Sequence, residues 1–578
     1  MKKSIRDDIG RKMKDNQNIE YKSDIDWKLS FGIGCIIGAV IFIIIYGVQI
    51  LDVTYDEWLV GYGDDPTMHY LGWRLFRNSH WTFPLGLSDN SLYPYRASIV
   101  YTDSIPLFAL IFKLLSPILP QKFQYFGLFG IFCFMLQGGT AKILLRKKIK
   151  QEWLRNVGAI FFITNVVFIQ RMFWHLALSA HFLILLGMIL FIYRNDIKNM
   201  YRKALLWIGL GGLAISIQFY IYGMLSVMLV FFVIIELIDT DKDLKKIFKV
   251  IIVYIIPYIA ITSLIFYVLG GFYGSVEVLD SNSGLYNADL STLINPMGKS
   301  IFFSNVSFSD SQMEGFGYLG SAIIILLILA LIGFLSNIKI FIKVKKKVFI
   351  LLVVYILAFF IFALSPVVLW HQEYLFSMNI FPSFVVKHIW GLFRGCGRFI
   401  WPVVYLFIYL AVVYSQRLLK KIYPVVIVLL LGLQVFEFSR YYLEINSKFQ
   451  NFEYFACPAD VLYQYDLSQY KHIQFMKNFK WIDYYSTTDG YLELVGYTRL
   501  AMDKDMTVSN FHYARDFDSV VQTQIDKSYE KLDSGKPDSD TIYVFPKEMY
   551  EANNLHGKYK NVFEFDTGYD ILLIPEIK

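Results

Sequence analysis

The chain has 578 residues, of which 56% are apolar and only 18% are charged. Soluble domains carry roughly 25% charged residues, so this composition excludes an ordinary soluble protein and an intrinsically disordered one. The net charge of +7 does not by itself indicate a nucleic-acid partner, because membrane proteins collect Lys and Arg on one side of the bilayer.

Eleven apolar runs have about the length that a membrane-spanning helix needs. They are 31–50, 123–145, 156–173, 176–193, 204–220, 221–238, 248–269, 319–336, 348–365, 400–415 and 422–437. The first run follows 30 polar and basic residues without a small-residue cleavage site, which predicts a retained anchor. The apolar stretch 105–120 is shorter, contains Lys113 and carries prolines at its ends, so we expect an interfacial helix there.

The basic residues predict how these spans are oriented. Lys and Arg number 29 in the 78 residues of segments 1–30, 146–155, 194–203, 239–249, 337–347 and 416–421. The alternate loops 51–122, 271–318 and 366–399 hold only 9 in 154 residues. The positive-inside rule therefore places the N-terminus in the cytoplasm and the C-terminus outside. The basic excess then belongs to topology, and nucleic-acid binding loses its support.

This topology divides the chain into a cytoplasmic segment (1–30), a transmembrane domain (31–437) and an extracytoplasmic domain (438–578). In the last part the apolar residues alternate, which is typical of strands. The predicted strands are 471–477, 490–497, 541–546 and 570–577. We expect a polytopic α-helical membrane protein with a small C-terminal α/β domain outside the membrane.

The first outer loop gathers acidic residues beside the predicted bilayer. Asp65 precedes Pro66, and an acidic residue before proline often begins a helix. His69 would then lie one turn later on the same face. A helix cap and a general base both fit Asp65 on spacing alone.

Four short strings carry a resemblance to known proteins: DPTMHYLGW at 65–73, TDSIPL at 102–107, FGYLG at 316–320 and GRFIWP at 397–402. They are similar to strings of a bacterial multi-pass family related to the GT-C glycosyltransferases. The architecture also resembles GT-C enzymes, in which a first span leads into a long outer loop with an acidic residue and interfacial helices, followed by many more spans.

The resemblance implies a sugar donor linked to a polyprenyl phosphate and a catalytic acid in the first outer loop. We assign the base to Asp65, with Asp64, Asp56 and Glu57 as the alternatives. Glu57 and His69 also count as substrate-binding candidates, and Asp103 as an acceptor-binding one. A cap before the interfacial helix is an equal interpretation of Asp103.

The donor phosphate requires fixed positive charge near the outer interface. The candidates are Arg171, His175, His181, Lys387, Arg394 and Arg398. Arg394 and Arg398 are preferred because a guanidinium can grip phosphate with two parallel donors and keeps its charge. Basic residues that only snorkel to the interface are the alternative. The aspartates could hold Mg²⁺ or Mn²⁺, but no metal site is predicted.

The sequence therefore predicts a glycosyltransferase of the bacterial plasma membrane that moves a sugar to an envelope glycan or lipid-linked acceptor on the outer face. Two other classes stay open. A lipid or polysaccharide flippase would place ionisable residues at mid-membrane, where these runs are almost clean. A non-catalytic envelope assembly protein would need only the outer loops and the C-terminal domain.

Overall fold

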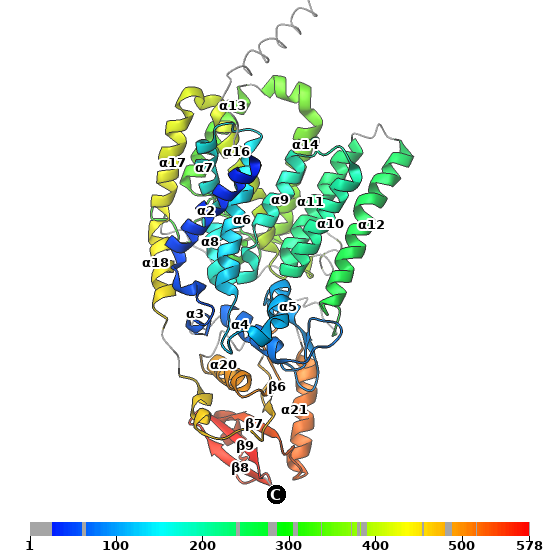
Figure 1. The fold of residues 1–578 in the computed structure, drawn as a ribbon, viewed down its shortest axis with the longest axis vertical. Coiled ribbons are helices and arrows are strands. Elements are labelled where there is room, and N and C mark those ends of the chain that lie inside the picture. Colours follow the sequence, from blue (N-terminus) through cyan, green and yellow to red (C-terminus); the bar gives the residue numbers. More distant parts are fainter. Residues whose placement is uncertain are drawn as a thin grey trace, which may run out of the picture.

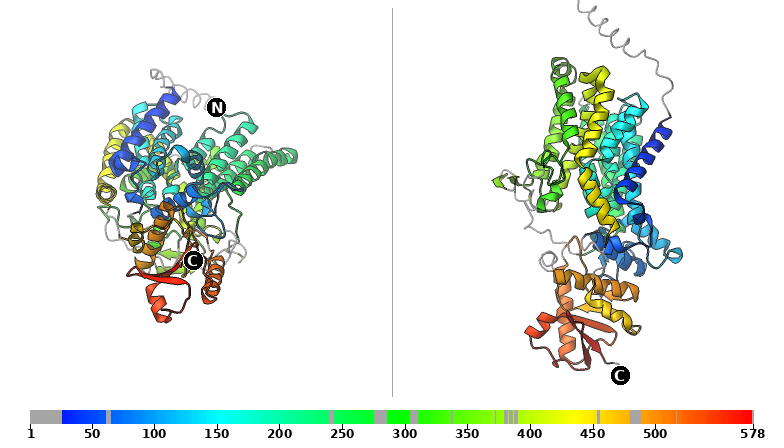
Figure 2. Two further views of the ribbon diagram at one scale, coloured as in Figure 1. Left: turned by 60° about the horizontal axis from the view of Figure 1, so that its bottom comes forward. Right: turned by 90° about the vertical axis from the view of Figure 1, so that its left-hand side faces the viewer.

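Long apolar helices form most of the structure, and a small sheet domain follows them at the C-terminal end (Figure 1). Short helices of the first loop lie between these two parts (Figure 2). The computed structural model describes residues 26–60, 65–238, 243–274, 286–303, 310–336, 338–371, 373–378, 382, 386, 390–452, 456–479, 488–515 and 517–576.

Each of the eleven predicted runs overlaps one helix or two consecutive helices. These are α2 (Trp27–Tyr46), α6 (Phe126–Arg146), α7 (Glu152–Ile163), α8 (Val166–Trp174), α9 (Phe182–Ile192), α10 (Met200–Ile217), α11 (Phe219–Ile238), α12 (Leu244–Val268), α13 (Ser321–Leu335), α14 (Ile338–Leu364), α16 (Trp401–Leu419) and α17 (Tyr423–Glu437).

By length and composition, seven helices of the described residues could cross a membrane, or eight if the bent pair α7–α8 is one span. The helices at Leu176–Ile192 and Ser321–Leu335 are apolar but shorter, and one stretch, Cys396–Glu437, covers the last two predicted runs. Several apolar candidate spans are thus present, and the count of eleven stays a prediction.

Glycines let the first helix approach its neighbour closely. A Cβ on Gly34 of α2 would overlap the Gly138 carbonyl of α6, and a Cβ on Gly138 would overlap the Gly34 carbonyl. Gly38 likewise touches the backbone at Phe134. Small residues at such crossings allow backbone contact between membrane helices, and the start of the first loop meets α6 in the same way where Gly127 touches the Ile50 carbonyl.

The first loop folds into short helices. It contains η1 (Gln49–Leu51), α3 (Glu57–Val60), α4 (Asp65–Asn78), the hairpin β1 (Leu87–Ser88) and β2 (Ala97–Ser98), η2 (Ile99–Thr102), α5 (Pro106–Leu114) and η3 (Ser116–Ile118). The predicted helix beginning near Pro66 is α4, and the predicted short helix at 105–120 is found as α5 and η3. Later loop segments contain η6 (Asp310–Gly315), the hairpin β3 (Val367–Trp370) and β4 (Glu373–Ser377), and η8 (Cys396–Ile400).

The C-terminal domain is built on a five-stranded sheet with the order β6-β5-β7-β9-β8. The strands are β5 (His472–Phe475), β6 (Thr507–Val508), β7 (Thr541–Pro546), β8 (Val562–Asp566) and β9 (Asp570–Pro575). β5 runs parallel to β6 and β7, whereas β9 is antiparallel to both of its neighbours. Among the described residues they are accompanied by the 3₁₀ helix η10 (Pro458–Gln464) and by α20 (Thr488–Asp503), α21 (Asp518–Asp533) and α22 (Lys547–Ala552).

The predicted strands at 471–477, 541–546 and 570–577 are confirmed as β5, β7 and β9. The predicted strand at 490–497 is wrong, because this segment lies inside α20. Its buried apolar positions Leu494, Val495, Tyr497, Leu500 and Ala501 follow helical spacing once the longer window is considered.

Helix α18 (Ser439–Gln450) falls within the predicted domain 438–578 but packs on the helix bundle. The Asn446 amide donates to the carbonyl of Ile44 (3.2 Å), and Phe449 meets Tyr46 edge to face at 5.3 Å. The sheet domain therefore begins only after α18.

The sheet domain docks on the first loop. Arg74 of α4 pairs with Asp503 (3.3 Å), and the Asn78 amide donates to the Met502 carbonyl (3.1 Å). Tyr93 stacks on His472 with 3.8 Å between ring centroids. These contacts fix the domain against the face of the bundle from which α4 and α5 emerge.

The predicted orientation can be tested by thiol labelling of intact cells. The four cysteines of the chain are buried free thiols, so the wild type should label weakly. We expect a membrane-impermeant maleimide to label Ser534→Cys in the exposed turn after α21 and not Lys198→Cys, which the positive-inside rule places in the cytoplasm. After cell lysis both variants should label. The reverse pattern in intact cells would contradict the orientation.

Candidate active site

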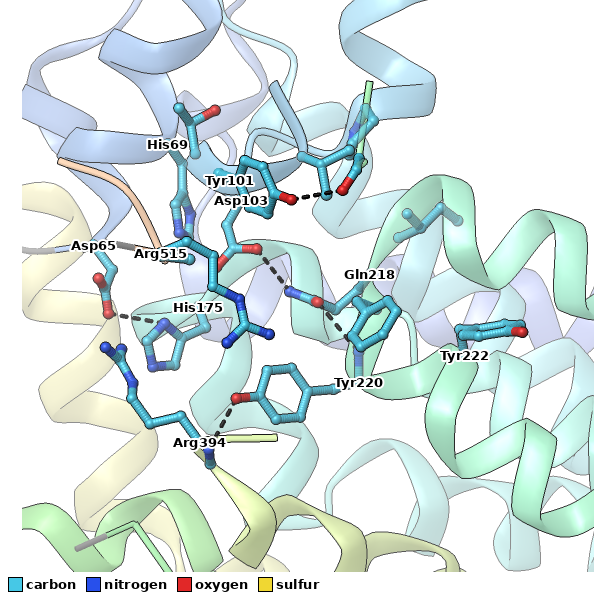
Figure 3. Close-up of a pocket in the computed structure, with 18 of the residues that line it drawn as sticks. Asp65, His69, Tyr101, Asp103, His175, Gln218, Tyr220, Tyr222, Arg394 and Arg515 are labelled. Carbon is cyan, nitrogen blue, oxygen red and sulfur yellow. Dashed lines mark hydrogen bonds and ion pairs between the residues drawn. The ribbon is translucent and has the colours of Figure 1, made fainter. Parts of the chain in front are cut away.

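A cavity of about 870 Å³ opens where the first loop, the helix bundle and the C-terminal domain meet (Figure 3). Charged and titratable side chains gather at one end. They are Asp65, His69, Asp103, His175, Glu314, Arg394, Arg398, His512 and Arg515. Asp65, Asp103, His69, His175, Arg394 and Arg398, which the sequence singles out over more than 300 residues of chain, are thus brought to one cavity.

Helix α4 and the segment after η2 place two carboxylates in this cavity. Asp65 and His69 occupy the first turns of α4. A Cβ on Gly72 would collide with the side chains of Thr102 and Ser104, so only glycine permits this approach. Asp103 follows η2 in the left-handed conformation (φ 51°), a backbone region that Asp tolerates better than most residues.

His175 reaches the site because the helix bends before it. Asn165 caps α8 by accepting from the amide of Val167 (3.0 Å), and the pair α7–α8 bends by 56°. α8 ends at Trp174, so His175 lies at the helix terminus and its ring points into the cavity.

His175 bridges two carboxylates from distant parts of the chain. Its Nδ1 lies 2.8 Å from Asp65 Oδ2, and its Nε2 lies 2.6 Å from Glu314 Oε1. Figure 3 shows the imidazole beside Asp65. The resulting chain, Asp65–His175–Glu314, fixes the orientation of the Asp65 carboxylate.

Glu314 is the point where this chain meets two guanidinium groups. Arg171 Nη1 donates to Glu314 Oε2 (3.0 Å), and Arg398 Nε donates to the same oxygen (2.6 Å). Arg171 also donates to the Met313 carbonyl. A carboxylate held by two arginines and a histidine is a compact charged cluster, and all its members are buried or nearly so.

Hydrogen bonds and close backbone packing hold the segment that carries Glu314 in place. The Thr292 hydroxyl donates to the Gly315 carbonyl (2.5 Å), and the Gly397 amide donates to the Tyr286 carbonyl (3.1 Å). Cβ atoms on Gly315 or Gly397 would collide with the backbone around Ala288. Two glycines therefore bring the Glu314 segment and the Arg398 segment together.

The protonation states of the cluster follow from these contacts. Burial opposes the charge on His175, but Asp65 and Glu314 raise its pKa to about 9. Burial would raise the pKa values of both carboxylates, but His175 holds the pKa of Asp65, and Arg398 with His175 holds that of Glu314, well below the usual range. At neutral pH both acids are ionised and His175 is a cation.

The other two histidines of the cavity are neutral at this pH. Burial lowers the pKa of His69, and it lowers the pKa of His512 to about 4. The Nδ1 atom of His69 is buried without a hydrogen-bond partner among the described residues, which makes it an unused polar atom at the cavity wall.

A second polar group lies opposite Asp65. Gln218, between α10 and α11, donates from Nε2 to Asp103 Oδ1 (3.1 Å), and its Oε1 accepts from the Tyr220 amide (3.3 Å). The Tyr220 hydroxyl accepts from the amide of Gly395 (2.8 Å). The guanidinium of Arg398 lies 4.3 Å from the Tyr220 ring. Asp103 is therefore connected to Arg398 through Gln218 and Tyr220.

The potential metal ligands of Asp65, His69 and His175 lie within 4.8 Å of one another. In this arrangement both ring nitrogens of His175 already face carboxylates, Asp65 on one side and Glu314 on the other. Mg²⁺ also prefers an all-oxygen ligand set. The contacts present are those of an ion pair between Asp65 and His175, with His69 as their neighbour.

Several predicted site residues lie elsewhere. Asp56 accepts from the Tyr70 hydroxyl (2.7 Å) and lies near Lys122, Glu57 is exposed at the start of α3, and His181 contacts the Tyr405 hydroxyl inside the bundle. None of these three lines the cavity. Arg171 does not line the cavity either, but it forms an ion pair with the lining residue Glu314. Asp64 and Lys387 fall outside the described residues.

The structure adds Glu314, Gln218, Tyr220, His512 and Arg515 to the candidates from the sequence. Two of them could have been chosen as candidates from the sequence. Glu314 stands two residues before the FGYLG string, and Gln218 interrupts apolar runs, where polar residues are costly. No sequence pattern marks His512 and Arg515, because they reach the cavity only through the docking of the C-terminal domain.

Residues 35–439 match a family described as Domain of unknown function (DUF6311), and residues 466–569 match its C-terminal domain. The chain belongs to the DUF6311 family. The two matched regions correspond to the helix bundle and the sheet domain, so the cavity is built from both parts of the family's architecture. Among curated proteins, none matches this chain.

The charge on His175 predicts a pH dependence of stability. Its folded-state pKa of about 9 lies above the unfolded value of about 6.5. The ion pairs therefore stabilise the fold fully below about pH 6.5, and the stabilisation is lost as the pH rises through about 9. We expect the Tm of the detergent-solubilised protein to fall between pH 6.5 and 9.

The matched controls are two histidine variants. His175→Gln should lower the Tm at pH 6.5 and flatten the profile, because glutamine does not titrate. His80→Gln, at an exposed histidine that pairs with Asp89, should leave the profile above pH 6.5 unchanged. An identical slope in wild type and His175→Gln would show that His175 is neutral in the fold.

Proposed function

We propose that this DUF6311 protein is a membrane glycosyltransferase. It transfers a sugar from a polyprenyl-phosphate donor to a hydroxyl group of an envelope glycan or lipid-linked acceptor, on the outer face of the plasma membrane. The observation that carries the proposal is the division of the cavity into a charged end and an apolar end, which suits a ligand with a polar head and a hydrocarbon tail.

The apolar end is formed by helices of the bundle. Ile215 and Ile217 come from α10, Phe219 and Tyr222 from α11, and Phe266 from α12. These helices are candidate membrane spans, so a polyprenyl chain could reach this end from the bilayer. A soluble nucleotide-sugar donor would gain nothing from such a surface.

The charged end carries an excess of positive charge. Four cations line it, namely His175, Arg394, Arg398 and Arg515, together with three carboxylates, namely Asp65, Asp103 and Glu314. A fifth cation, Arg171, pairs with Glu314 from behind the cavity wall. Because positive charges gathered in one cavity repel one another without a counter-ion, the cavity favours an anionic ligand. A phosphate ester meets this requirement and gains negative charge when its glycosidic bond breaks.

The transfer needs a base, and Asp65 suits this role. It is ionised and fixed by His175 at the charged end of the cavity. In the proposed step an acceptor hydroxyl gives its proton to Asp65 and its oxygen attacks the anomeric carbon. The bond from that carbon to the phosphate oxygen breaks, and polyprenyl phosphate leaves with the electron pair.

Asp103 and His69 can position the acceptor. Asp103 has one oxygen bound by Gln218, and His69 has an unused ring nitrogen. The resemblance of the strings at 65–73 and 102–107 to a family related to GT-C enzymes supports the same assignment, since both strings lie at this cavity.

Asp65→Asn should abolish turnover while the fold is kept, because the amide preserves the shape of the side chain and removes the base. We expect the release of polyprenyl phosphate to fall about 10²–10⁴-fold. The measurement is mass spectrometry of lipid products from protein in liposomes, with a panel of polyprenyl-phosphate sugars and envelope extract as acceptor.

The matched control is Asp89→Asn, which changes an aspartate of the same loop that pairs with His80 outside the cavity. Its turnover should equal that of the wild type. Normal turnover in Asp65→Asn would transfer the role of the base to Asp103. Movement of intact lipid across the bilayer by both proteins, without release, would favour a flippase.

A further inference from the structure

One wall of the cavity belongs to the C-terminal domain. The loop between β6 and α21 contributes His512, Ala514 and Arg515 to the lining. All the other lining side chains come from the first loop and the helix bundle or its later loops. The charged end is therefore shared between the C-terminal domain and the rest of the chain, and Asp103 of the first loop stands more than 400 residues before His512.

Backbone contacts hold this loop in place. The Val508 amide donates to the Asn90 carbonyl (2.8 Å), and the Tyr93 amide donates to the Val508 carbonyl (3.0 Å). Further along, the Ala514 amide donates to the Tyr101 carbonyl (2.7 Å). The loop is thus paired with the first loop on both sides of His512.

Arg515 is the cation that this loop contributes to the cavity lining. Its Nη2 donates to the Leu392 carbonyl (2.9 Å), which holds the guanidinium over the cavity and leaves other N–H donors for a ligand. Among the described residues, no carboxylate forms an ion pair with Arg515. Arg171 and Arg398, in contrast, are both engaged by Glu314.

The position of Arg515 matches the head group of an amphipathic ligand. In Figure 3 its guanidinium extends toward Gln218 and Tyr220, between the acidic end at Asp65 and the apolar end at Tyr222. Arg394 extends toward Asp65 on the other side. An anionic group at the boundary of the two ends would therefore lie beside Arg515.

We propose that Arg515 binds the phosphate group of a polyprenyl phosphate and that this binding site is complete only when the C-terminal domain is docked. The inference rests on the proposed function for the identity of the lipid. The neutral His512 beside it supplies a hydrogen-bonding group rather than a second charge. The C-terminal domain is then part of the substrate site.

The test is a binding measurement on the full chain in lipid nanodiscs, with sugar-free polyprenyl phosphate as the probe. We expect Arg515→Gln to weaken binding about 10–100-fold, because one charge-assisted contact is lost. Arg515→Lys should recover part of the affinity. Lys536→Gln, which removes a charge from an exposed site of the same domain, should bind like the wild type.

A neutral polyprenol serves as the second probe, and inorganic phosphate as the third. Polyprenol should bind wild type and Arg515→Gln equally, since it has no phosphate for the guanidinium. Inorganic phosphate that competes only in the wild type would show a site for phosphate in general. Equal affinity of polyprenyl phosphate for wild type and Arg515→Gln, in proteins of equal Tm, would overturn the proposal.

The outcome is separable from that of the proposed function, because binding requires no turnover. If Arg515→Gln weakens binding in a protein that transfers no sugar, the phosphate site stands and the transferase does not. If the wild type transfers sugar and Arg515→Gln binds and transfers equally well, the transferase stands and the role of Arg515 is rejected.

Discussion

One carboxylate, Glu314, organises the charged end of the cavity. Two arginines and a histidine converge on it from α8 and from η8. Bringing these cations together without an anion would be prohibitively costly, since an uncompensated buried charge costs several kcal/mol. The bent helix before His175 and the glycine contact at Gly397 both have the effect of delivering these groups to Glu314.

The chain of charges then passes from Glu314 through His175 to Asp65. Because His175 lies between two carboxylates, it stays protonated and keeps Asp65 ionised. The helix bundle therefore controls the charge and orientation of a residue on the first loop. A carboxylate held in this way is ionised and oriented before any substrate binds.

Local patterns predicted the local features well. The helix at Asp65, the face shared with His69 and all eleven apolar runs follow from short-range preferences, and the structure places helices there. The segment 490–497 was mispredicted because its short alternation hides a helical period. Glu314 could not be paired with Arg171 from the sequence, since 143 residues separate them and only tertiary packing brings them together.

The cavity carries its surplus of positive charge because two parts of the chain contribute to it. Glu314 forms ion pairs with Arg171 and Arg398 of the bundle. These two arginines therefore mainly hold the charged cluster together. Arg515 adds a cation from the C-terminal domain, beside an apolar surface that the bundle supplies. Neither part alone offers both a phosphate-sized anion site and a place for a hydrocarbon chain. The selectivity for an amphipathic anion that we propose therefore depends on the docking of the two parts.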